Sequence, residues 1–144
     1  MAQELLVRAL IIRDRKILVC QTTGRDYFFL PGGHVEFGET MQVALRREIR
    51  EEIDAKIIAC SFIGSVENIF EQDSRKKHEV SFVFHVDIDV KDVISKEEHL
   101  SFYWATFEQF LTLKVLPSAL KDAIIAWTAE KEAFFVEEKT GNSN

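Results

Sequence analysis

Cysteine is scarce in this 144-residue chain, and it has no long uninterrupted hydrophobic run. The two cysteines, Cys20 and Cys60, lie in separate apolar segments and form no Cys-x-x-Cys pair. This spacing argues against a disulfide framework and favours two buried, reduced thiols. The apolar start of the chain is interrupted by Glu4 and Arg8, so it predicts neither a signal peptide nor a membrane span. We therefore expect a cytoplasmic protein.

Positive charge is also in short supply, with 18 Lys and Arg against 24 Asp and Glu and a formal net charge of −6. This balance disfavours non-specific binding to nucleic acid or to an anionic membrane, because both depend on clustered Lys and Arg. An acidic enzyme still binds nucleotides when metal ions screen the phosphates. The length suffices for one domain with a single core. We expect that domain at residues 1–136, followed by a polar tail at 137–144.

The pattern of apolar residues predicts an α/β domain with a mixed sheet covered by helices. Strands are expected at residues 4–13, 16–21, 27–30, 55–70, 80–90 and 100–106. A bend is expected at Gly64 in the fourth of them. Helices are expected at 40–53 and from 116 to about 135, with a helical turn at 107–111. A charged connection is expected at 71–77, and a frayed tail after residue 136.

Three glutamates of the predicted helix 40–53, Glu48, Glu51 and Glu52, fall on one helical face at about 100° per residue. That face borders the apolar stripe formed by Leu45, Ile49 and Ile53. Like charges crowded beside a buried surface repel each other and lose hydration, and a hard cation such as Mg²⁺ or Mn²⁺ relieves both costs. The alternative is a solvated surface helix in which arginines pair with the glutamates.

A glycine-rich loop precedes this helix and favours the cation site over the solvated surface helix. Pro31-Gly32-Gly33 and Gly38 allow the backbone to approach a ligand closely, and Thr40 is suited to cap the helix. Residues 33–55 fit the string G-x5-E-x7-R-E-U-x-E-E-x-x-U, where U is usually a bulky aliphatic residue. At these positions the chain resembles the Nudix hydrolases.

The chain departs from the family pattern at two positions, both at the end of the helix. The family usually has glycine where Asp54 stands and a bulky aliphatic where Ala55 stands. Asp tolerates the left-handed conformation at a cost of roughly 1 kcal/mol. Ile57 or Ile58 is expected to supply the packing that Ala55 lacks. We therefore expect an altered helix end and an intact metal site.

The resemblance implies an α/β/α sandwich and hydrolysis of a diphosphate bond in a nucleoside diphosphate linked to another group, with Mg²⁺ or Mn²⁺ as cofactor. It implies Glu48 and Glu52 as metal ligands, Glu51 as a third ligand directly or through water, and the Gly32 carbonyl as a backbone ligand. Arg47 would orient a neighbouring glutamate, Glu39 would pair with a basic group to hold the loop on the helix, and Gly33 belongs to the structural part of the motif.

The general base and the substrate stay open at this point. Glu79 is the candidate base outside the motif, because it opens a strand beside His78 after a polar loop; the alternative is an ordinary strand-edge glutamate. His34 could touch a phosphate. Five aromatic residues could stack a base, although most aromatics in a sheet are core residues: Tyr27, Phe28, Phe70, Tyr103 and Trp104. Arg8 and Arg25 could meet phosphates.

Three functions fit these observations. The first is a metal-dependent nucleotide diphosphatase acting on a small-molecule nucleotide, and the second is a non-catalytic Nudix-fold module that senses a nucleotide. Loss of a motif glutamate would favour the second, and none is lost. The third is a protein–protein interaction domain with an acidic helix, which predicts no effect of divalent metal. The subgroup signatures for ADP-ribose, dinucleoside polyphosphates and coenzyme A are missing, and a homodimer is expected only because dimers are common.

Overall fold

The structure is a computed structural model that describes residues 2–140. Its elements, in chain order, are β1 (Glu4–Leu10), β2 (Ile12–Arg13), β3 (Lys16–Thr22), β4 (Gly32–His34), α1 (Met41–Ile53), β5 (Ile57–Gln72), β6 (Arg75–Ile88), β7 (Leu100–Thr106), α2 (Phe107–Thr112), α3 (Ser118–Glu130) and β8 (Phe134–Lys139). None of the helices within residues 2–140 has the length and apolar character needed to cross a membrane.

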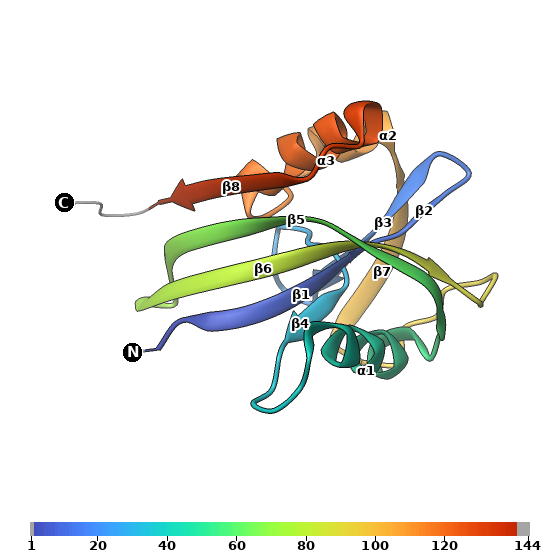
Figure 1. The fold of residues 1–144 in the computed structure, drawn as a ribbon, viewed down its shortest axis with the longest axis horizontal. Helices are drawn as coiled ribbons and strands as arrows, with labels where there is room; N and C mark the ends of the chain where they lie inside the picture. Colours follow the sequence, from blue (N-terminus) through green and yellow to red (C-terminus); the bar gives the residue numbers. More distant parts are fainter. Residues whose placement is uncertain (1, 141–144) are drawn as a thin grey trace.

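The larger sheet has five strands in the order β4-β1-β6-β5-β8. It is mixed, because β1 pairs with β6 and β5 with β8 in parallel, whereas β1–β4 and β5–β6 are antiparallel. Helix α1 lies on one side of this sheet, and α2 and α3 lie on the other (Figure 1). The predicted α/β/α sandwich is therefore confirmed. A second, antiparallel sheet in the order β2-β3-β7 accompanies it, which the sequence pattern did not indicate.

Two apolar clusters, one on each side of the larger sheet, form the core. Val7 and Ala9 of β1 pack with the α1 cluster, and Leu10 packs with the cluster beneath α2 and α3. Side chains alternate along a strand, so Arg8 lies on the same side as α3. The basic side chain of Arg8 therefore lies on the same face of β1 as the apolar Leu10, and it lines the cavity described below.

Helix α1 begins and ends as its sequence predicts. The Thr40 hydroxyl accepts a hydrogen bond from the Val43 N–H at 3.3 Å. Asp54 ends the helix in the left-handed conformation, with φ at 52°, and its N–H donates to the Arg50 carbonyl at 2.9 Å. Ile57 packs against the α1 cluster, whereas Ile58 is 63% exposed. Ile57 is thus the residue that compensates for Ala55.

The β5–β6 hairpin is longer than expected. Its turn contains only Asp73 and Ser74, both with positive φ, and pairing continues outward from Gln72 and Arg75. The predicted charged connection at 71–77 is therefore wrong, because polar side chains on a sheet edge do not prevent backbone pairing. The bend at Gly64 is confirmed by a shift in register there.

The C-terminal part also differs from expectation. The helix predicted to continue to about residue 135 ends at Glu130, and β8 follows in parallel with β5. Residues 137–139 are therefore strand rather than a frayed tail, and residues 141–144 lie outside the described part of the chain. The strand predicted at 27–30 is reduced to isolated bridges at Phe28 and Phe29, and the true edge strand is β4.

Candidate functional site

The Gly32–Gly33 turn packs closely against both β1 and α1. Gly32 has φ at 139°, and a side chain there would overlap the Val7 carbonyl oxygen. A Cβ on Gly33 would lie 2.6 Å from the Glu48 carboxylate. The absence of side chains thus brings the turn's backbone against the neighbouring strand and against Glu48, the first of the three helix glutamates.

Glu52 lies beneath this turn and is only 5% exposed. The Gly32 N–H donates a hydrogen bond to its Oε1 at 3.2 Å. Burial raises the pKa of Glu52 to about 8, and the charges of Glu48 and Glu97 add to that rise, while Arg8 and the Gly32 N–H oppose it. Two acidic groups are therefore held together beside a buried surface, as the helical spacing predicts.

Arg47 joins the glycine loop to the glutamates of α1. Its guanidinium donates to Glu39 at 2.7 and 2.9 Å, to Glu48 at 2.9 Å and to Glu51 at 3.3 Å, and it also donates to the His34 carbonyl at 2.9 Å. The bond from Arg47 lowers the pKa of Glu39 to about 2. Glu51 is the most exposed of the three helix glutamates, at 51% of its side chain. The pairing of Glu39 with Arg47 holds the loop on the helix.

Replacing Arg47 with lysine is expected to lower the free energy of unfolding by about 1–3 kcal/mol. One ammonium group cannot reproduce the planar set of contacts with the loop and the helix. Urea unfolding followed by circular dichroism measures the change. Arg50→Lys is the matched control, since Arg50 is an exposed arginine of the same helix; equal effects of the two substitutions would contradict the role of Arg47.

The loop between β6 and β7 attaches to the end of α1. The Lys96 N–H donates to the backbone carbonyl of Glu52 at 2.7 Å, and Ser95 hydrogen-bonds within the loop to the backbone of Glu97. The charge of Glu97 acts on Glu52. Sequence reasoning missed Glu97 because nothing local connects this polar loop with a helix some forty residues earlier. An acidic pair in the loop, Glu97–Glu98, is the one signal available.

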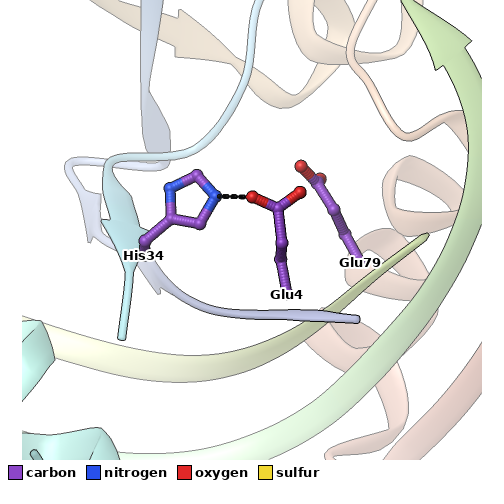
Figure 2. A group of neighbouring side chains, drawn as sticks. All are labelled: Glu4, His34 and Glu79. Atoms are coloured by element: carbon purple, nitrogen blue, oxygen red, sulfur yellow. Dashed lines mark hydrogen bonds and ion pairs between the residues drawn. The ribbon is translucent and has the colours of Figure 1, made fainter. Parts of the chain in front are cut away.

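Glu79 lies in a different group, with Glu4 and His34 (Figure 2). One ligand atom from each of the three lies within 4.8 Å of the others, and His34 Nε2 is 2.9 Å from Glu4. Glu4 also pairs with Lys77 at 3.5 Å. Burial raises the pKa of Glu79, with a smaller contribution from Glu4. These side chains could hold a cation, and the structure brings Glu79 together with them rather than with the helix glutamates.

A cavity of about 430 Å³ opens on the α3 side of the larger sheet. Tyr27 and Phe70, two of the five aromatics considered from the sequence, line it, and so does Phe29, which sequence reasoning missed. Phe28 packs edge-on against Tyr103 instead, with ring centroids 5.9 Å apart. The cavity therefore has aromatic walls.

The other aromatic and basic candidates lie elsewhere. Trp104 lies beneath the Arg13 guanidinium, and Arg25 pairs with Asp73 at 3.0 Å. Arg8 lines the cavity, donates to the Leu30 carbonyl at 3.1 Å and lies 5.4 Å from the centre of the Phe29 ring.

Arg8 also connects the cavity with the helix glutamates. Its positive charge lowers the pKa values of both Glu52 and Glu79, against the effect of burial. The charge of Arg8 therefore reaches both acidic groups, and an anion in the cavity could bind this guanidinium.

The NUDIX domain family model matches residues 4–127 of the chain. The chain belongs to the Nudix family. The ADP-ribose pyrophosphatase of Methanocaldococcus jannaschii is 38% identical over 85 residues, which cover 57% of this chain and 49% of that protein. The CTP pyrophosphohydrolase of Escherichia coli strain K12 is 29% identical over 134 residues, covering 89% of this chain and 96% of that one. The chain thus spans about half of the first relative and nearly all of the second.

A solved MutT protein from Bacillus halodurans shares the Nudix fold, with a TM-score of 0.80 over 98% of this chain and 93% of that one, at 14% identity. The predicted membership, fold class and enzyme class, a Nudix pyrophosphohydrolase, are therefore confirmed. Nudix hydrolases act on small nucleotide derivatives and generally need divalent metal ions.

Proposed function

We propose that this Nudix hydrolase uses Mg²⁺ or Mn²⁺ to cleave a diphosphate bond in a nucleoside diphosphate linked to another moiety, and that it releases a nucleoside monophosphate. The observation that carries the proposal is the buried Glu52 carboxylate beneath the Gly32–Gly33 turn, beside Glu48. A cavity large enough for a nucleoside is lined by Arg8.

The residues present fit a hard divalent cation. Glu48, Glu52 and the Gly32 carbonyl offer oxygen donors, which Mg²⁺ and Mn²⁺ prefer, and the more exposed Glu51 is suited to bind directly or through water. The raised pKa of Glu52 shows the electrostatic cost that a cation would relieve. When bound, such an ion neutralises the charge that develops on phosphate oxygens and lowers the pKa of a bound water.

The chain's other residues position the substrate and accept a proton. Arg47 fixes the carboxylates of Glu48 and Glu51, and Arg8 attracts the phosphates between the cavity and α1. We assign the general base outside the motif to Glu97 rather than to Glu79. The Lys96 N–H, next to Glu97, donates to the Glu52 carbonyl at 2.7 Å and so holds this loop against α1, whereas the Glu79 carboxylate lies with Glu4 and His34.

A substrate panel tests the proposal. It contains nucleoside triphosphates, ADP-ribose, nucleotide sugars and dinucleoside polyphosphates, each with Mg²⁺ or Mn²⁺; ADP-ribose and CTP come first because two relatives are named for them. We expect at least one member to release a nucleoside monophosphate, and chelation of the metal to stop the reaction. If no member of the panel is hydrolysed at high enzyme concentration while nucleotide still binds, the sensing module is favoured.

The interaction-domain alternative is tested separately by thermal unfolding. It predicts that Mg²⁺ and Mn²⁺ leave the unfolding temperature unchanged, whereas a metal site that binds only the folded state raises it. If the metal ions raise the unfolding temperature of the wild type but not that of Glu52→Gln, the interaction-domain alternative is excluded. The cytoplasmic location and the homodimer stay predictions from the sequence.

A further inference from the structure

The loop between β6 and β7 spans residues 89–99 and carries Glu97, the assigned general base. Its second half is fixed on α1 by the Lys96 N–H, which donates to the Glu52 carbonyl at 2.7 Å. Glu97 follows this contact directly in the chain. Because the path of a loop depends on both of its ends, the position of Glu97 also depends on how the first half leaves β6.

Arg13, at the end of β2, donates three hydrogen bonds to that first half. Its Nη1 lies 2.7 Å from the Val90 carbonyl oxygen and 3.0 Å from that of Lys91, and its Nη2 lies 3.2 Å from that of Ile88. Hydrogen bonds from a charged donor are stronger than those between neutral groups. One guanidinium therefore fixes the direction in which the chain leaves the larger sheet.

The second sheet in turn holds Arg13 in place. Strand β2 pairs with β3, and β3 pairs with β7. The Arg13 guanidinium lies 5.6 Å from the centre of the Trp104 ring of β7, where a cation is attracted by the face of the ring. Arg13 thus attaches the start of the loop to a sheet other than the one that the loop leaves.

The first half of the loop has a second support on α1. The Lys56 N–H donates to the Asp89 carboxylate at 2.8 Å, and the Asp89 N–H donates to the Lys56 carbonyl at 3.0 Å. Val90 and Val93 pack against the α1 cluster. Removal of the Arg13 contacts would therefore leave the loop attached on one side, and we expect it to shift rather than to unfold.

We propose that Arg13 is a positioning residue for the hydrolysis, which fixes the 89–99 loop so that Glu97 reaches the proton it accepts. The inference rests on the proposed function, in which Glu97 is the general base. A general base must lie within hydrogen-bond distance of that proton, and a displacement of about 1 Å can lower a rate on the order of 100-fold. Arg13 lines neither the cavity nor the Gly32–Gly33 turn, so it acts on the reaction only through the loop.

Arg13→Gln shortens the side chain and removes its charge, so the three hydrogen bonds are lost. On the best substrate of the panel we expect kcat to fall about 10- to 100-fold and KM to stay within about threefold, because the groups that bind the substrate are unchanged. Arg15→Gln, at an exposed position of the turn after β2, is the matched control and should keep the wild-type kcat. A wild-type kcat in Arg13→Gln would overturn the proposal.

A double-mutant cycle with Glu97→Gln separates positioning from a general loss of structure. If Arg13 acts through Glu97, Arg13→Gln lowers kcat in the wild type but changes the residual kcat of Glu97→Gln by less than about twofold. A structural defect elsewhere lowers both values by the same factor, and that additive result would reject the proposal. A wild-type kcat in Glu97→Gln would reject it as well, since no base would then need to be positioned.

Hydrogen exchange of the Lys96 N–H, measured by NMR without metal or substrate, tests the loop independently of catalysis. We expect this amide to exchange at least about tenfold faster in Arg13→Gln than in the wild type or Arg15→Gln, because the loop opens more often. Faster exchange in a protein that hydrolyses no nucleotide would sustain the link between Arg13 and the loop and reject the hydrolase. Hydrolysis at the wild-type rate with unchanged exchange in Arg13→Gln would sustain the hydrolase and overturn the inference.

Discussion

Glu52→Gln is expected to lower kcat/KM by about 10³-fold or more and, in the same step, to stabilise the metal-free protein at neutral and alkaline pH. The substitution keeps the shape of the side chain and its contact with the Gly32 N–H, but it removes the charge that holds a divalent cation. Initial rates of nucleoside monophosphate release, measured with Mg²⁺ or Mn²⁺ on the best substrate of the panel, give the change in activity.

The stabilisation follows from the raised pKa of Glu52. An unfolded glutamate ionises near pH 4.5, whereas Glu52 in the fold ionises at about pH 8. Stability from the neutral form is therefore fully present below pH 4.5 and is lost as the pH rises through about 8. The loss is on the order of 5 kcal/mol at most, and a neutral amide avoids it. Thermal unfolding in EDTA should show the advantage of Glu52→Gln growing between pH 5 and pH 8.5.

Glu51→Gln is the control for this pH dependence, because the Glu51 side chain is half exposed and its charge is hydrated. It should not reproduce the gain in stability. Mn²⁺ should raise the unfolding temperature of the wild type and have little effect on Glu52→Gln. A Glu52→Gln variant that hydrolyses substrate at the wild-type rate, or that is no more stable at pH 8.5, would remove the basis of the metal site.

The grouping of the helix glutamates beside the glycine turn could be predicted because its information is local. The spacing of Glu48, Glu51 and Glu52 fixes their common face, and Thr40 and Asp54 mark the ends of the helix that carries them. The turn's close contacts with β1 and with Glu48 also agree with its two glycines, because a Cβ at either position would overlap these neighbours.

The other half of the site depends on contacts between distant segments. Glu79 meets Glu4 only through the parallel pairing of β6 with β1, and Glu97 approaches Glu52 only when its loop attaches to α1. Strand β8 was missed for a related reason. Its apolar Phe134 and Val136 suit either a helix or a strand, and pairing with β5, beside the space left by Gly64, decides for the strand.

Gly32→Ala is expected to cost about 3 kcal/mol or more of unfolding free energy, a large part of the roughly 5–15 kcal/mol by which a typical domain is stable. The added Cβ would overlap the Val7 carbonyl oxygen, and that atom belongs to the backbone of a buried strand that cannot move without disturbing the sheet. The φ of 139° adds strain for any residue with a side chain. Urea unfolding followed by circular dichroism measures the loss.

Gly38→Ala separates backbone strain from steric overlap. Gly38 also has a positive φ, 91°, but a Cβ there would meet nothing within 4 Å. We expect it to lose only roughly 1 kcal/mol, which is the cost of strain alone. The difference between the two variants then measures how tightly the turn is held against β1. Because that contact fixes the Gly32 N–H and carbonyl above Glu52, equal and small losses in both variants would mean that the turn can move away from the carboxylate.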